Sequence, residues 1–138
     1  MKGLTIKEIK VGDSASFSKT VTETDIVMYA GLSGDFNSAH IDAESAKHGM
    51  FGQRIAHGML SAGFISNALG NNLPGPGGIY LSQELRFLKP VFIGDTVTAT
   101  VTAVERIEEK NRLKMETIVT NQRGEQVISG FAWVLPTK

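Results

Sequence analysis

The second half of the chain alternates between apolar and polar positions, a pattern typical of strands that bury one face. The clearest case is 96–103, where Val or Ala stands at every second position and threonine fills the positions between. Weaker alternation, or a high content of β-branched and aromatic residues, predicts three more strands, at 79–87, 113–119 and 126–135. Turn-forming residues lie between the predicted strands, at 94–95, 109–111 and 121–124. These spacings predict a run of antiparallel hairpins.

The first half of the chain predicts one strand and several helices. Apolar residues at 15, 17 and 21 indicate a strand, and Thr22 with Asp25 three residues later is the sequence of a capping box that begins a short helix. Another short helix is predicted from Asp42 to Gly49. The segment 58–69 carries apolar and small residues on every side, which is typical of a buried helix.

One buried helix before four or five antiparallel strands predicts an α+β fold in which the sheet curls around the helix, the hot-dog arrangement. An open sheet with the helix laid across one face would produce the same pattern. The 138 residues predict one domain, 1–138, with no internal repeat. A chain of this length buries enough surface to be stable without disulfides or a structural metal.

Composition excludes several classes of function. The 14 basic residues balance the 14 acidic ones, and no basic cluster is present, which argues against nucleic acid as a partner. No apolar stretch is long enough to cross a membrane, and the first residues lack the apolar core of a signal peptide. The chain has no cysteine, which fits a reducing compartment. We therefore expect a cytoplasmic protein.

The polar loop 33–40 is the first candidate site. It brings Asp35, Asn37 and His40 within six residues, and two such side chains on an irregular loop can transfer protons to and from one water molecule. Ordinary turn chemistry is the alternative, because Asp and Asn often satisfy their own backbone and a lone loop histidine is often structural.

The start of the predicted helix 58–69 is the second candidate site. Free N–H groups and the positive end of the helix dipole favour an oxyanion there, and glycine at 58 leaves room for a carbonyl group. Gly58 could instead serve close packing, and we interpret His57 as a partly buried cap residue rather than a base. Ser66 could contact a ligand or hydrogen-bond the carbonyl four residues before it. The three histidines lack the spacing of a metal-ligand pair, so no metal site is predicted.

Several segments together resemble the R-specific enoyl-CoA hydratase family, the MaoC-like or hydratase 2 group of hot-dog proteins. The resemblance covers nearly the whole chain and rests on Tyr29–His40, Ile55–Leu60, Tyr80–Leu81, Phe87, Pro90–Val91 and Gly94–Asp95. The motif Ser-Gly-Asp-x-Asn-x-x-His followed by His-Gly-Met is specific within hot-dog folds. One departure is that Ser38 and Ala39 stand where the family usually has proline and a branched aliphatic residue.

The resemblance implies hydration of a trans-2-enoyl-CoA to an (R)-3-hydroxyacyl-CoA, without a cofactor, since the coenzyme A thioester is the substrate. Asp35 and His40 would hold and activate the water, Asn37 would support the loop, and the Gly58 N–H would polarise the thioester carbonyl. Ser66 matches a helix position that faces the acyl pocket.

The acyl tail is expected to run beside the central helix. Leu69 would then lie near the end of the pocket, which Trp133 or Val134 on the last strand could close, and we expect a preference for chains of about four to six carbons. Alternation does not decide which face of that strand points inward. We also expect a homodimer, because an exposed sheet edge can pair across a two-fold axis.

Two other functions stay open. A hot-dog acyl-CoA thioesterase would bind the same substrate but release a free thiol. A non-catalytic acyl-thioester binding module would bind without turnover, and Ser38 in place of proline makes this conceivable. The sequence does not decide between coenzyme A and an acyl-carrier protein as carrier, although the neutral net charge favours coenzyme A.

Overall fold

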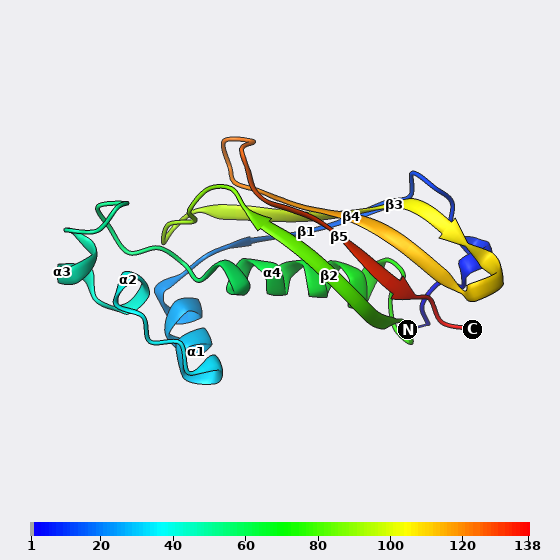
Figure 1. Cartoon of the computed structure of the whole chain (residues 1–138), viewed down its shortest axis with the longest axis horizontal. Helices are drawn as coiled ribbons and strands as arrows, with labels where there is room; N and C mark the ends of the chain where they lie inside the picture. Colours follow the sequence, from blue (N-terminus) through cyan, green and yellow to red (C-terminus); the bar gives the residue numbers. More distant parts are fainter. Residues whose placement is uncertain (1) are drawn as a thin grey trace.

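The computed structural model describes residues 2–138, in which five strands form one antiparallel sheet. The strands are β1 (Ser14–Thr20), β2 (Ile79–Phe87), β3 (Thr96–Ile107), β4 (Arg112–Thr120) and β5 (Gln126–Leu135). They lie in the order β1-β3-β4-β5-β2, so β1 and β2 form the two edges (Figure 1). All of the predicted strands are present, and β3 runs four residues beyond its predicted end.

The two faces of the sheet differ as the alternation predicts. Val97, Ala99, Val101 and Ala103 of β3 are fully buried in the core. On the other face, serines of β1 and threonines of β3 form cross-strand hydrogen bonds of 2.7 to 3.2 Å. Such pairs stabilise neighbouring strands on a solvated face.

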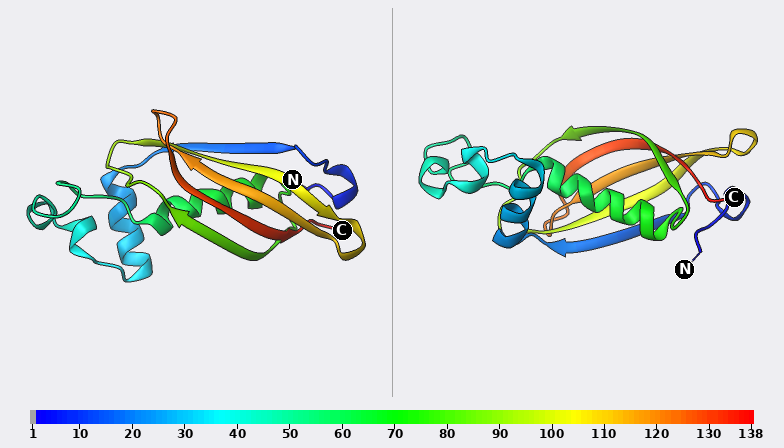
Figure 2. Two further views of the ribbon diagram at one scale, coloured as in Figure 1. Left: turned by 45° about the horizontal axis from the view of Figure 1, so that its top comes forward. Right: turned by 90° about the horizontal axis from the view of Figure 1, so that it is seen from below.

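The helix α4 (Gly58–Asn67) crosses the inner face of the curled sheet and continues as a π-helical turn, Ala68–Asn72 (Figure 2). The hot-dog prediction is confirmed. The expectation of a helix buried on all sides needs correction. Leu60 and Ile65 pack into the core, whereas Met59, Gly63 and Ser66 are exposed, because the sheet covers only one side of the helix.

Three more helices lie beyond one end of the sheet, where Figure 1 shows them at the left. They are α1 (Glu23–Ser33), α2 (Ser38–Ile41) and α3 (Ala43–Ala46). The capping box is confirmed, because the Asp25 N–H donates to Thr22 Oγ1 and the Thr22 N–H donates to the Asp25 carboxylate. Burial alone would raise the pKa of Asp25, but hydrogen bonds from Lys19 and Thr22 lower it overall.

Two helix predictions are wrong in detail. The helix predicted at 42–49 ends at Ala46, and the loop predicted to be irregular contains α2. Both helices are single turns held by side-chain caps, Asn37 for α2 and Asp42 for α3, and such short turns carry too little periodicity to be seen in a sequence. None of the helices in the part of the chain that is described is both long and apolar enough to span a bilayer.

Candidate active site

A series of side-chain hydrogen bonds builds the polar loop between α1 and α2. The Ser33 hydroxyl accepts from the Asp35 N–H at 3.1 Å, and the Asp35 carboxylate accepts from the Asn37 N–H at 3.1 Å. Asn37 Oδ1 in turn accepts from the Ala39 N–H at 3.0 Å. Each step spans two residues, the geometry of Asx and Ser/Thr turns. Local hydrogen bonds therefore order the loop. One carboxylate oxygen of Asp35 accepts from the loop backbone, and the other is available to contact a ligand.

The same bonds explain how the loop forms without the usual proline. Ser38 is the first residue of α2, the position where proline is favoured in helices. Here Asn37 supplies the cap instead, and its own backbone is extended, with φ −53° and ψ 134°. Asn37 caps α2 and does not line the pocket beside it.

His40 is fixed at its backbone and at its ring. Its Nδ1 lies 2.8 Å from the Ile55 carbonyl oxygen, and Arg54 Nε donates to the His40 carbonyl at 2.7 Å. Because a carbonyl can only accept, Nδ1 carries the proton in the neutral ring and Nε2 is left with a free lone pair. The Ala56 N–H donates to the Val91 carbonyl, which ties this segment to the connection between β2 and β3. His40 thus presents a basic nitrogen from a rigid support.

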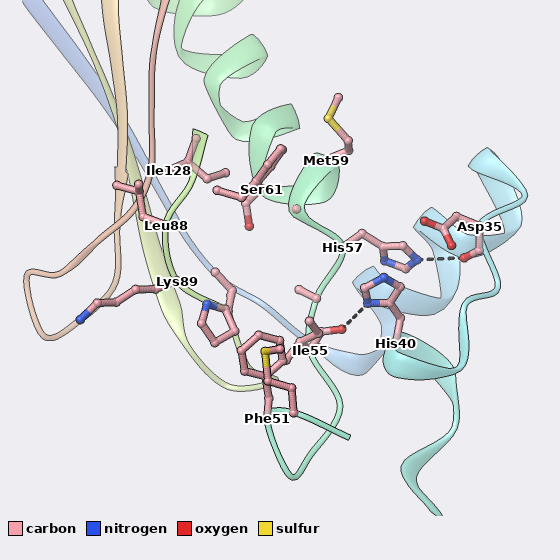
Figure 3. A pocket seen from close by; sticks show the side chains of 16 residues that line it. Asp35, His40, Phe51, Ile55, His57, Met59, Ser61, Leu88, Lys89 and Ile128 are labelled. Atoms are coloured by element: carbon pink, nitrogen blue, oxygen red, sulfur yellow. Dashed lines mark hydrogen bonds between the residues drawn. The ribbon is translucent and has the colours of Figure 1, made fainter. Parts of the chain in front are cut away.

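Asp35, His40 and Gly58 line one pocket of about 560 Å³ at the start of α4 (Figure 3). The two candidate sites singled out in the sequence thus lie against the same pocket. The other walls are mostly apolar and come from separate segments of the chain: Met50, Phe51, Ile55, Ala56, Met59, Phe87–Val91 and Ile128. No pattern in the sequence marks these wall residues, because each belongs to a turn or a strand end whose neighbours are decided by the fold.

Gly58 is packed closely against β2. A Cβ atom at this position would lie 2.5 Å from Cε1 of Phe87, well inside contact distance. The close-packing interpretation of this glycine is therefore supported. It is compatible with the oxyanion interpretation, because Gly58 is exposed to the pocket at the first turn of a ten-residue helix.

His57 was expected to be a partly buried cap, and this needs correction. The residue stands at the N-cap position of α4, but its side chain makes no capping hydrogen bond and is only 2% exposed. Its ring is stacked on that of His40, with centroids 3.9 Å apart, and Figure 3 shows Asp35 beside the pair. Burial and stacking follow from the packing of α2 against the start of α4, which the sequence does not reveal.

Asp35, His40 and His57 form the group of potential metal ligands in the described part of the chain, with one ligand atom of each within 4.8 Å of the others. The sequence predicts no such group, because His57 is distant in the chain from Asp35 and His40. One nitrogen of each ring already faces a backbone carbonyl, Ile55 for His40 and Asp35 for His57. The unprotonated Nε2 of His40 and the carboxylate of Asp35 suit this arrangement to handling protons at a water molecule.

The residues predicted for the acyl pocket do not all lie together. Ser66, Leu69 and Val134 line a second cavity of about 200 Å³, towards the C-terminal end of α4. Tyr80 lines it too, and burial raises the pKa of this phenol to about 12. Trp133 lies on the opposite face of β5, with the Lys114 ammonium 6.0 Å from its ring centroid.

The orientation of β5 follows from its neighbours. Val134 pairs with Leu113 and is buried, whereas Trp133 pairs with Lys114. Since successive side chains of a strand point to opposite faces, Trp133 points away from α4. The expected position of Trp133 in the acyl pocket is corrected, and of the two residues considered on the last strand it is Val134 that faces the helix.

Comparison with known proteins agrees with this geometry. The family model described as MaoC like domain matches residues 7–125. An (R)-specific enoyl-CoA hydratase from Rhodospirillum rubrum is 53% identical, covering 94% of this chain and 89% of that protein. The protein of the same name from Aeromonas caviae is 39% identical, covering 95% and 98% of the two chains.

Solved structures give the same result. The unliganded R-hydratase from Pseudomonas aeruginosa matches with a TM-score of 0.94 at 42% identity, covering 99% of this chain and 87% of that one. The A. caviae (R)-hydratase involved in PHA biosynthesis matches with a TM-score of 0.90 at 40% identity, covering 93% and 97%. The fold, the family match and these relatives together establish that the chain belongs to the MaoC-like domain family.

Proposed function

We propose that the protein is an R-specific enoyl-CoA hydratase, which adds water reversibly and with syn geometry to a trans-2-enoyl-CoA to form an (R)-3-hydroxyacyl-CoA. The observation that carries the proposal is the meeting of Asp35, His40 and the start of α4 in one largely apolar pocket. Relatives named for this activity, at up to 53% identity among those compared, support it.

The chemistry needs a base, an acid and an electrophile. Asp35 and the free Nε2 of His40 hold a water molecule and take one of its protons as the oxygen attacks C3 of the enoyl thioester. The Gly58 N–H donates a hydrogen bond to the thioester oxygen as negative charge builds there, and the proton taken from water is then delivered to C2. Because water and proton are handled from one face, addition is syn. The reverse sequence dehydrates the product.

The first test measures the loss of enoyl-thioester absorbance with crotonyl-CoA, together with free thiol. Asp35→Asn and His40→Ala should each lower kcat at least about a hundredfold while the melting temperature stays close to that of wild type. Release of free thiol would instead identify a thioesterase. Tight binding without any turnover would identify a non-catalytic binding module, and a variant with near-normal turnover would remove that residue from the mechanism.

The proposal includes a homodimer. Two observations support it: α4 leaves an exposed face with Met59 and Ser66, and the edge strand β2 leaves Ile79 and Leu81 exposed. The catalytic pocket and the second cavity lie near opposite ends of α4, with Gly58 and Ser66 about 12 Å apart along the helix axis. A two-fold axis beside the helix would bring the second cavity of one chain next to the catalytic pocket of the other.

A mixed dimer tests this arrangement. Chains with Asp35→Asn are combined with chains that carry Leu69→Ala, so that the intact Asp35 belongs only to the second chain. If the partner supplies the acyl pocket, the active site keeps Leu69 and the wild-type preference for chain length. If one chain supplies both, the preference shifts as in the Leu69→Ala homodimer, and the proposed arrangement fails. A monomer in light scattering under assay conditions would exclude the dimer.

Other parts of the proposal rest on the same family relationship. The acyl carrier is coenzyme A, the whole chain 1–138 forms one MaoC-like domain, and the protein acts in the cytoplasm without a cofactor. Exhaustive dialysis against EDTA should leave hydration of crotonyl-CoA unchanged. Loss of activity that added Zn²⁺ restores would instead make Asp35, His40 and His57 a metal site.

A further inference from the structure

His57 is a buried histidine for which the proposed mechanism has no use. It stands directly before Gly58, yet its side chain does not cap α4. The ring turns inward, towards the loop between α1 and α2. A residue needed only to begin the helix would more commonly be Ser, Thr, Asp or Asn. The side chain therefore has a role other than capping, which its contacts with Asp35 and His40 indicate.

The first contact is with the backbone of Asp35. His57 Nε2 lies 2.9 Å from the Asp35 carbonyl oxygen, and because the carbonyl only accepts, Nε2 carries the proton and donates. The Asp35 carboxylate is held from the other side by the Asn37 N–H. The residue proposed to activate water is thus fixed through both its main chain and its side chain, and the main-chain contact comes from a segment 22 residues away.

The second contact is with His40. The two imidazole rings are nearly parallel, with an interplanar angle of 29°, while Tyr29 packs on His57 with centroids 4.7 Å apart. His40 is otherwise held in the plane of its ring by the bond to Ile55. Stacking against His57 limits its movement out of that plane. One side chain therefore contacts both residues that the mechanism places at the water.

The unpaired Nδ1 of His57 indicates that the Nε2–H donor is the reason for a histidine at this position. His57 Nδ1 is buried and has no hydrogen-bond partner within residues 2–138, which is unfavourable for a polar atom. Phenylalanine would fill the same space and stack on His40 without that penalty. A histidine at this position is explained by the hydrogen bond that its Nε2–H makes to Asp35.

We propose that His57 is a positioning residue, which holds the Asp35 backbone and the His40 ring in register for proton transfer and does not itself carry the proton. This inference rests on the proposed hydratase function for its kinetic consequences. Its structural content, the hydrogen bond to Asp35, can be tested whether or not the protein hydrates enoyl thioesters.

Two substitutions separate the two contacts. His57→Phe keeps an aromatic ring beside His40 but loses the donor, whereas His57→Gln keeps an N–H donor near the position of Nε2 and loses the ring. His48→Phe is the matched control, because His48 is exposed and does not line the pocket. We expect His57→Phe to lower kcat about 10- to 100-fold with little change in KM, His57→Gln to recover most of that loss, and His48→Phe to match wild type.

A double-variant comparison distinguishes positioning from general structural damage. In the Asp35→Asn background, His57→Phe should lower kcat further by less than about threefold, because the group that it positions is already lost. A loss as large as in the wild-type background would overturn the proposal. A wild-type kcat in His57→Phe would also overturn it. The same holds if His57→Phe and His57→Gln lose equal amounts of kcat, in parallel with a fall in their melting temperatures.

A measurement without substrate completes the test. The amide of Phe36 shares a peptide unit with the Asp35 carbonyl, so its ¹⁵N signal reports on the hydrogen bond from His57. We expect this signal to move in His57→Phe and to stay near its wild-type position in His57→Gln. No movement in His57→Phe would refute the positioning role, whereas a clear movement in a protein that fails to hydrate crotonyl-CoA would leave that role standing and reject the hydratase function.

Discussion

Replacing Gly58 by alanine tests how the start of α4 serves the reaction. The new Cβ would lie 2.5 Å from Cε1 and 2.6 Å from Cδ1 of Phe87, whereas ordinary contacts begin at 3.4 Å. The ring must therefore retreat by about 0.9 Å. Phe87 is 55% exposed and can swing outward, and alanine is the better helix former. We expect the free energy of unfolding to change by no more than about 1 kcal/mol.

Activity should respond far more than stability. The methyl group stands beside the N–H that is proposed to receive the thioester oxygen, and the displaced Phe87 ring is itself a wall of the pocket. Loss of one oxyanion donor typically lowers kcat by about 10² to 10³, and a shift of about 1 Å in a substrate can cost about 10². We therefore expect kcat of Gly58→Ala with crotonyl-CoA to fall about a hundredfold.

A second variant separates the two causes. In the Phe87→Ala background the ring can no longer be displaced, so any further loss caused by Gly58→Ala comes from the methyl group at the helix start. We expect this further loss of kcat to remain about a hundredfold. If Gly58→Ala alone keeps kcat within about threefold of wild type, or if the loss disappears without the Phe87 ring, the glycine serves packing and the oxyanion role is wrong.

Three further predictions concern the loop, the acyl pocket and acid stability. Ser38→Pro should stabilise the protein by about 0.4 to 1 kcal/mol in thermal unfolding and leave kcat unchanged, because the backbone of Asn37 before it is already extended. Destabilisation would mean that the fold needs the Ser38 N–H as a hydrogen-bond donor. Leu69→Ala should raise kcat/KM for 2-dodecenoyl-CoA relative to crotonyl-CoA by about tenfold or more, whereas Trp133→Ala on the outer face should not change this ratio. If the ratio is the same in both variants, the acyl chain does not bind in the cavity beside Leu69. Hydrogen bonds, the largest from Lys89, lower the pKa of Glu125 to about 2, so its stabilisation is present above about pH 4.5 and is lost as the pH falls towards 2. The difference in melting temperature between wild type and Glu125→Gln should shrink over that range, and a constant difference would contradict the shift.

Much of the fold is visible in local sequence patterns. The alternation in β3, the capping box at Thr22 and the small and apolar residues of α4 are each produced by interactions within a few residues, so they can be read directly from the chain. The loop around Asp35 belongs to the same class, because its hydrogen bonds each span two residues. Local physics was therefore sufficient to predict the strands and the helices α1 and α4, and to single out the polar loop, whereas the single turns α2 and α3 escaped prediction.

The tertiary structure decided what those elements face. Alternation places Trp133 and Val134 on opposite sides of β5, but only packing against α4 and β4 determines that Val134 points inward. The burial of His57 against His40 depends on contacts between segments far apart in the chain, and so do the apolar walls of the pocket. A periodic pattern records that a residue has a buried side, whereas the partner on that side is chosen by the whole fold.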